Sequence, residues 1–168
     1  MSPTVSASGS PTSSRLLFVC LGNICRSPTA ENVMRHLADE SGLGDRIICD
    51  SAGTSGYHIG SPPDRRMHQA AKAKGIPLTG EARQFCAEDF ERFDLILAMD
   101  SQNYRDILRL DAGDRFASKV KMMCDYCTNH PDKDVPDPYY GGGDGFRYVV
   151  ELLQDACTGL LDELCEQE

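Results

Sequence analysis

A cysteine and an arginine near the start of the chain, Cys20 and Arg26, have five residues between them in the run CLGNICRS. A cysteine thiolate is a strong nucleophile, and a guanidinium group holds two oxygens of a phosphate in a planar fork. The pair therefore predicts covalent transfer of a phosphoryl group to sulfur. The same spacing also arises when a buried structural cysteine precedes a surface arginine, so the surrounding residues must decide between the two interpretations.

The residues around this pair favour an anion-binding loop. Gly22 and Asn23 are residue types that tolerate the positive φ values needed to curl such a loop. Ser27 is placed to cap a helix that starts at Pro28, and backbone N–H groups and the helix dipole attract anions at such a start. This field favours the thiolate of Cys20. A nucleotide-binding loop is not predicted, because neither a Gly-Lys-Ser/Thr ending nor a G-x-G-x-x-G pattern is present.

Asp137 precedes Pro138 in an irregular stretch rich in Asp, Pro and Gly, and its carboxyl group could take part in catalysis. An Asp-Pro pair also opens turns that have no catalytic role. Because Cys20 and Arg26 are present, we favour the catalytic interpretation.

Composition excludes several classes of function. A formal net charge of −9 over 168 residues argues against a general nucleic-acid binder. No apolar run approaches the roughly 18 residues of a membrane-spanning helix, so we expect no membrane partner. Eight cysteines without a secretory signal predict free thiols in a reducing compartment, and hence a cytoplasmic protein. We expect no cofactor.

The pair Cys124 and Cys127 has the spacing of half a zinc site. No second pair of suitable spacing follows, and His130 is the only imidazole nearby, so we expect no metal. The other histidines have no evident catalytic partner, and we expect them at the surface or behind the site: His36, His58 and His68.

Short apolar runs alternate with helical patterns along the chain. The runs at 15–20, 46–50, 94–99 and 119–123 predict buried strands, and helical periodicity follows them, longest in the last helix from Phe146 to Leu164. This order predicts an α/β fold with a doubly wound, four-stranded parallel sheet and helices on both faces. Such sheets bind ligands at the carboxyl ends of their strands, where the phosphate-binding loop follows the first strand.

The chain fits one domain, over residues 15–168. Residues 1–14 are rich in Ser, Thr and Pro and carry no charged side chain. That composition is typical of a disordered tail, because it offers little apolar surface to bury.

The segment VCLGNICRSP at residues 19–28 resembles the signature loop of the low-molecular-weight protein-tyrosine phosphatases. Further segments match that family in the same order: DSAGTSGY from residue 50, PPD from 62, ARQ from 82, FD from 93, MD from 99 and DPYYG from 137. Together they span nearly everything from Leu16 to the C-terminus. The resemblance implies hydrolysis of phosphotyrosine through a cysteinyl-phosphate intermediate.

The resemblance also implies a role for each matching residue. Cys20 corresponds to the nucleophile, Arg26 to the phosphate clamp, and Asp137 to the general acid. Other positions resemble residues that shape the loop, which are Leu21, Gly22, Asn23, Ile24, Cys25, Ser27 and Ser51. Cys25 corresponds to a thiol that traps oxidised Cys20 as a disulfide. The residues expected to form or adjoin the substrate slot are Tyr57, Tyr139, Tyr140 and Asp100.

The implied partners are phosphotyrosine proteins, including a tyrosine kinase, with inorganic phosphate as product and inhibitor. One position departs from the family, since Gly80 stands where many relatives have a histidine that braces Asn23.

Three alternative functions remain. A thioredoxin-coupled arsenate reductase needs two further cysteines, but only Cys86 lies in that region. A protein-arginine phosphatase carries Thr at the position of Ile24. A non-catalytic phosphate-binding module would be expected to lack Cys20 or Asp137.

Overall fold

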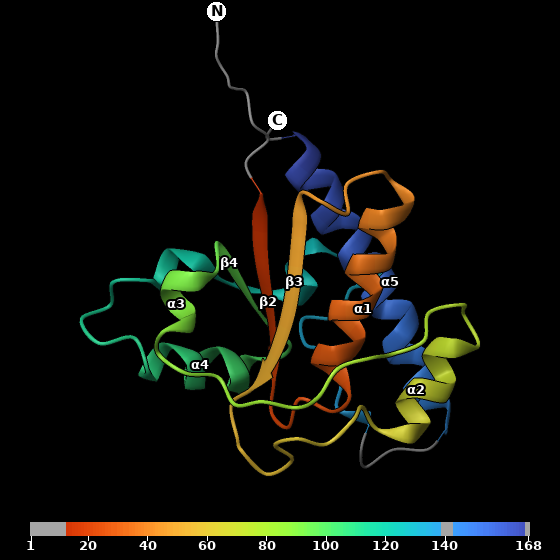
Figure 1. Cartoon of the computed structure of the whole chain (residues 1–168), viewed down its shortest axis with the longest axis horizontal. Coiled ribbons are helices and arrows are strands. Elements are labelled where there is room, and N and C mark those ends of the chain that lie inside the picture. The colour runs from red at the N-terminus through yellow and green to blue at the C-terminus, as the bar shows by residue number, and fades with distance from the viewer. Residues whose placement is uncertain (1–12, 139–142, 167–168) are drawn as a thin grey trace, which may run out of the picture.

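The computed structural model describes residues 13–138 and 143–166 (Figure 1). Four parallel strands form one sheet in the order β3-β2-β4-β5. Their bounds are Ser14–Cys20 for β2, Ile47–Gly53 for β3, Leu95–Ala98 for β4 and Val120–Met122 for β5. The predicted α/β fold with a doubly wound parallel sheet is confirmed.

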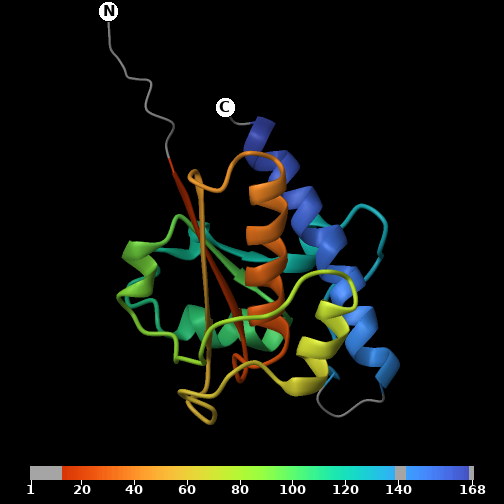
Figure 2. The ribbon, with the colours of Figure 1, turned by 45° about the vertical axis from the view of Figure 1, so that its right-hand side comes forward.

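Helices cover both faces of this sheet, as Figures 1 and 2 show. On one face lie α1 (Arg26–Glu40) and α5 (Gly143–Glu166), with α2 (Arg65–Lys72) packed against α5. The other face carries α3 (Asp89–Arg92) and α4 (Ser101–Arg109). Two short 3₁₀ helices flank β5, namely η1 (Ala117–Lys119) and η2 (Met123–Tyr126). None of the helices in the described part of the chain has the length and apolar character that a membrane crossing requires.

The central strand β2 is buried on both sides because its side chains alternate between two cores. Leu16 and Phe18 pack with α1 and α5, whereas Leu17 and Val19 pack with α3 and α4. All four side chains are fully buried. Burying each one contributes about 1.5–3 kcal/mol, so the strand that ends at Cys20 is among the most firmly held parts of the chain.

All four strands differ in extent from the sequence prediction, and the difference is largest for β3. β3 runs to Gly53 rather than ending at Asp50, because Ser51, Ala52 and Gly53 continue the parallel register beside Phe18, Val19 and Cys20. β5 is only three residues long, since the chain turns into η2 at Met123. The longer β3 carries Ser51 to the level of the phosphate-binding loop.

The start of α1 differs from the predicted one. The helix begins at Arg26 with Cys25 at the N-cap, and no side chain caps it. Ser27 was expected to be the cap, but its hydroxyl lies against Cys20 instead. Because no capping side chain occupies the N-terminus, the N–H groups of the first turn can receive an anion.

The predicted tail lies outside the described residues except for its last two positions. Ser14, which was counted with the tail, is the first residue of β2 and is in parallel register with Ile47. Its N–H donates to the carbonyl of Arg46 at 2.7 Å, so the ordered strand begins there.

Candidate active site

A pocket opens where β2 ends and the loop to α1 begins. Six of its lining residues come from the predicted loop and three from other segments: Cys20, Leu21, Gly22, Ile24, Cys25 and Arg26, with Tyr57, His58 and Asp137. The structure therefore brings together the expected nucleophile, clamp and acid, although Asp137 is more than a hundred residues from Cys20 in the chain.

Cys20 is buried, and polar groups surround its sulfur. The backbone N–H of Asn23 donates to Sγ at 3.2 Å, and Ser27 Oγ lies 3.0 Å from the same atom. These contacts fix the position of the sulfur within the loop.

Asn23 holds the loop in its curled form. Its φ of 58° is in the left-handed region, as its residue type predicted. Its side-chain amide donates to Ser27 Oγ at 2.8 Å and to Ser51 Oγ at 3.0 Å, and its Oδ1 accepts the backbone N–H of Arg83 at 2.9 Å. Ser51 in turn donates to Glu31 Oε1 at 2.6 Å. Buried polar groups are stable when they are paired in this way, so the network fixes one loop conformation.

Asn23 is held in place without a histidine at position 80, where this chain has Gly80. The residue has a φ of 109° and contributes no side chain to Asn23. Arg83 braces Asn23 with its backbone N–H, while its guanidinium pairs with Asp50 at 3.0 Å and with Asp89 at 3.0 Å. Sequence reasoning assigned no role to Glu31 or to Arg83; the matching segment Ala82-Arg83-Gln84 was the only signal.

Arg26 is buried with three oxygen-bearing neighbours. Its Nη1 donates to Asp100 Oδ2 at 2.6 Å and to the carbonyl of Val135 at 3.0 Å, and Nη2 lies 3.7 Å from Asp137 Oδ2. Burial opposes the charge, but the Cys20 sulfur and the Asp100 carboxylate outweigh it and raise the pKa of Arg26. The guanidinium is thus permanently charged and is oriented before any phosphate arrives.

Asp100 has two roles that sequence reasoning left open. Besides holding Arg26, it is the N-cap of α4, where its Oδ1 accepts the backbone N–H of Asn103 at 2.8 Å. The backbone N–H of Asp100 donates to Asn103 Oδ1 at 3.2 Å, which completes a capping box. The helix therefore fixes the carboxylate that positions Arg26.

Asp137 reaches the pocket through a docked backbone segment. Two residues earlier, the N–H of Val135 donates to the carbonyl of Met99 at 2.8 Å, and the Val135 carbonyl accepts from Arg26. Met99 follows β4, and its N–H donates to the carbonyl of Val19 in β2 at 3.0 Å. The Asp137 side chain is one-third exposed, so solvent can reach it.

Tyr57 lines the pocket and is 82% exposed, so it stands at the rim. The other two predicted slot residues, Tyr139 and Tyr140, lie outside the described residues. His58 was expected at the surface or behind the site, but it lines the pocket. Its ring packs closely on Gly22, and a Cβ there would lie 2.9 Å from His58 Cδ2, so a larger residue would displace the His58 side chain.

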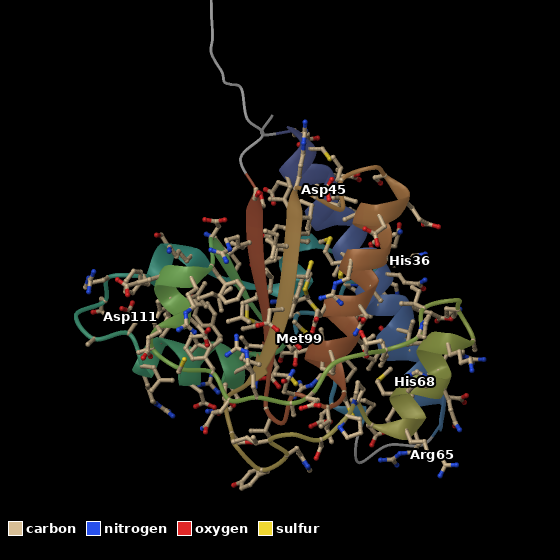
Figure 3. All side chains as sticks on the ribbon, viewed as in Figure 1. His36, Asp45, Arg65, His68, Met99 and Asp111 are labelled. Carbon is tan, nitrogen blue, oxygen red and sulfur yellow. The ribbon has the colours of Figure 1, made fainter. Side chains whose placement is uncertain are left out.

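The other histidines lie where they were expected. His36 pairs with Glu40, and His68 accepts the N–H of Leu78, both on the α1 and α2 side of the molecule (Figure 3). His130 lies 2.7 Å from Asp155. Within residues 13–138 and 143–166, no group of three or more metal-binding side chains is present.

Cys25 is buried beside the nucleophile and also lines the pocket. Burial, followed by the charges of Asp64, Cys20 and Asp137, raises the pKa of its thiol well above the ordinary range. Cys25 is therefore protonated at neutral pH.

Comparison with known proteins agrees with this geometry. Residues 15–168 match the family model described as low molecular weight phosphotyrosine protein phosphatase. The chain belongs to this family. A Synechocystis sp. protein whose name assigns it provisionally to the low molecular weight protein-tyrosine-phosphatases is 59% identical over 150 residues, covering 89% of this chain and 96% of its own. The human low molecular weight phosphotyrosine protein phosphatase is 42% identical over 151 residues, covering 88% and 94%.

The fold is also similar to that of a solved structure. The crystal structure of a protein tyrosine phosphatase from Entamoeba histolytica superposes with a TM-score of 0.89 at 44% identity, covering 92% of this chain and 99% of its own. The chain is accordingly a protein-tyrosine phosphatase of the low-molecular-weight class, and the arsenate reductase and arginine phosphatase alternatives are not favoured.

Proposed function

We propose that the protein hydrolyses phosphotyrosine in proteins with Cys20 as nucleophile, Arg26 as clamp and Asp137 as general acid. The observation that carries this proposal is the position of the Cys20 sulfur, which faces a pocket lined by Arg26 and Asp137 and receives the Asn23 N–H. A thiolate, a fixed cation and a carboxyl group then border one pocket.

In the first step the Cys20 thiolate attacks phosphorus, and the bond from phosphorus to the tyrosine oxygen breaks. Asp137 gives its proton to that oxygen, so that tyrosine leaves as a neutral phenol. Arg26 and the N–H groups at the start of α1 bind the equatorial oxygens, where negative charge must be stabilised in the transition state. Asp100 acts on this step through Arg26, which it orients.

In the second step water attacks the cysteinyl phosphate. The Asp137 carboxylate takes a proton from that water, and the bond from phosphorus to sulfur breaks. Phosphate and the Cys20 thiolate are the products, and Asp137 is protonated again for the next cycle. Inorganic phosphate fits the same site, and we propose that it inhibits.

The walls of the pocket favour an aromatic ester. Leu21 and Ile24 offer apolar side chains beside the loop, and Tyr57 adds an aromatic ring at the rim. A flat phenol gains from such contacts, whereas a phosphorylated guanidine needs a polar partner. The position of Ile24 therefore supports phosphotyrosine over phosphoarginine.

The proposal extends to the domain boundaries, the location, the substrates and the redox control of the protein. We propose one domain over residues 15–168 preceded by a tail, a cytoplasmic location, and a tyrosine kinase among the substrates. Reversible inactivation by a disulfide between Cys20 and Cys25 is also proposed, because both sulfurs border one pocket and Cys25 can resolve an oxidised Cys20.

Parallel turnover of phosphotyrosine, phosphoserine and phosphoarginine peptides tests the proposed specificity, with arsenate reduction as a fourth assay. We expect phosphotyrosine to be turned over fastest by a wide margin. Ile24→Thr is the matched variant, and it should shift the ratio toward phosphoarginine while leaving the loop intact. Faster turnover of phosphoarginine by the unaltered protein, or thiol-dependent arsenate reduction, would overturn the proposal.

A further inference from the structure

Cys124 and Cys127 form a thiol pair that the phosphatase mechanism does not use. Neither residue lines the catalytic pocket. Cys124 lies in η2, and Cys127 is the residue that ends this helix. Both are free thiols.

The local backbone places the pair at a distance that suits a disulfide. The N–H of Cys127 donates to the carbonyl of Cys124 at 3.2 Å, which is the bond between residues i and i+3 of a 3₁₀ turn. Residues three apart in such a turn lie above one another with a rise of about 6 Å. Disulfides join Cα atoms that are roughly 4.4–6.8 Å apart, so this turn needs little movement to close the bond.

Contacts on both sides hold the turn rigid. Gly159 of α5 lies so close that a Cβ there would be 1.9 Å from the Tyr126 carbonyl oxygen, so η2 packs directly on the helix backbone. After Cys127, Asp155 accepts the backbone N–H groups of Thr128, Asn129 and His130, each at 3.0 Å. A rigid dithiol loses little conformational freedom when its sulfurs join.

The two thiols differ in access and acidity. Cys124 is 6% exposed, whereas Cys127 is partly open to solvent. Burial, with Cys127 next, raises the pKa of Cys124 to about 12, and burial, with Asp155 next, raises the pKa of Cys127 to about 11. Cys127 is thus the thiol that an oxidant reaches first, and Cys124 is the one that resolves the product.

We propose that Cys124 and Cys127 are a second redox couple of this protein, which neutral or cationic small-molecule disulfides convert to an intramolecular disulfide. Cys127 as thiolate attacks one sulfur of the reagent and releases one thiol, leaving a mixed disulfide on Cys127. Cys124 then attacks the Cys127 sulfur and releases the second thiol. Two protein thiols are oxidised and one reagent disulfide is reduced to two thiols.

The charge preference follows from the surroundings of the pair. The carboxylates of Asp132, Asp134 and Asp155 act on these thiols and repel an anionic reagent. The net charge of −9 acts in the same direction. Cystamine, which is a cation, should therefore react faster than oxidised glutathione, which is an anion.

The test treats the full chain with cystamine while inorganic phosphate occupies the catalytic pocket, then alkylates the remaining thiols and maps the peptides. We expect a crosslink between Cys124 and Cys127 with the loss of two hydrogen atoms, reversed by a reducing agent, and phosphatase activity retained after reagent removal. Oxidised glutathione at equal concentration should react roughly tenfold more slowly at low salt, and the difference should shrink as salt screens the charges.

Two variants separate this couple from its neighbours. Cys127→Ser should abolish the crosslink, whereas Cys157→Ser, which alters a buried thiol of α5, should retain it. A stable mixed disulfide on Cys127, a crosslink to Cys157 instead, or two free thiols after treatment of the unaltered protein would each overturn the proposal. Equal rates with both reagents would overturn the charge preference.

Discussion

The phosphate-binding loop at residues 20–27 and the acid-bearing segment at residues 128–137 are held in contrasting ways. The loop is continuous in sequence, and its Asn23 is 3% exposed and bonded through all of its side-chain polar atoms. The acid-bearing segment has irregular structure, and it is anchored at separate points by Asp155, Asp134 and Val135. The side chain of Asp137, the proposed general acid, is one-third exposed.

This contrast corresponds to two chemical tasks. Binding a phosphate and stabilising its transition state require donors fixed in advance, and a buried network supplies that rigidity. A proton donor must meet leaving groups and water in turn, which a more open side chain allows. The loop is therefore expected to be sensitive to small structural changes, and the segment chiefly to loss of its carboxyl group.

The largest expected effect comes from Cys20→Ser. A serine hydroxyl is not ionised near neutral pH, so turnover of phosphotyrosine peptides should fall to background. Vanadate or phosphate binding should persist, because Arg26 and backbone N–H groups hold the anion. Kinetics and calorimetry on the same preparation check both statements; substantial residual turnover would end the nucleophile assignment.

Asp137→Ala should slow phosphotyrosine peptides by about 10²- to 10⁴-fold, the usual contribution of a general acid. Aryl phosphates whose phenol leaves without a proton should be much less affected in the phosphorylation step. Comparing the two substrate types in this one variant distinguishes the loss of a proton donor from a structural defect. Equal losses would mean that Asp137 is a turn residue, and Asp100 would be the next candidate.

Asn23→Ala should test the rigidity of the loop. The change removes three side-chain bonds and places alanine at a φ of 58°, so we expect a loss of about 10- to 100-fold in kcat/KM, from about 1–3 kcal/mol per unsatisfied buried group. Ser51→Ala is the matched control, since it removes one partner of Asn23 and keeps the backbone unstrained. A loss with Ser51→Ala as large as that with Asn23→Ala would contradict the central position of Asn23.

Asp155→Asn should have the smallest effect on catalysis and a clear effect on stability. Burial opposes ionisation of Asp155, but hydrogen bonds from Thr128, His130 and Asn129 outweigh it and hold the pKa of this carboxyl well below its usual range. A lowered pKa in the folded state adds stability above the unfolded value of about 3.9, and that stability is lost as pH falls toward the folded value.

The unaltered protein should therefore lose stability on acidification more steeply than Asp155→Asn, and near neutral pH the variant should be less stable by about 1–3 kcal/mol. Denaturant unfolding at a series of pH values measures both. Activity of the folded variant should stay within a few fold of the original, because Val135 docks independently on Met99. Parallel stability curves for the two proteins would show that the carboxylate does not anchor the segment.

The sequence by itself determined the architecture and the chemical core of the site. Buried strands alternate with helical periodicity, which is a local property of the chain, so the doubly wound sheet could be predicted. Cys20, Asn23 and Arg26 lie within one short loop, where residue type and spacing decide the geometry. Matching segments then assigned Asp137, which spacing alone left ambiguous.

Tertiary structure alone decided what completes that site. Arg83 braces Asn23 directly, Glu31 braces it through Ser51, and His58 contacts Gly22. These contacts join residues that are 20 to 60 positions apart. Such pairs depend on how strands stack and where loops return, and no residue type or period in the sequence encodes that distance. Tertiary contacts also decided that α1 begins at Arg26. The Ser27 hydroxyl bonds to groups of β2 and β3 and does not cap its own helix.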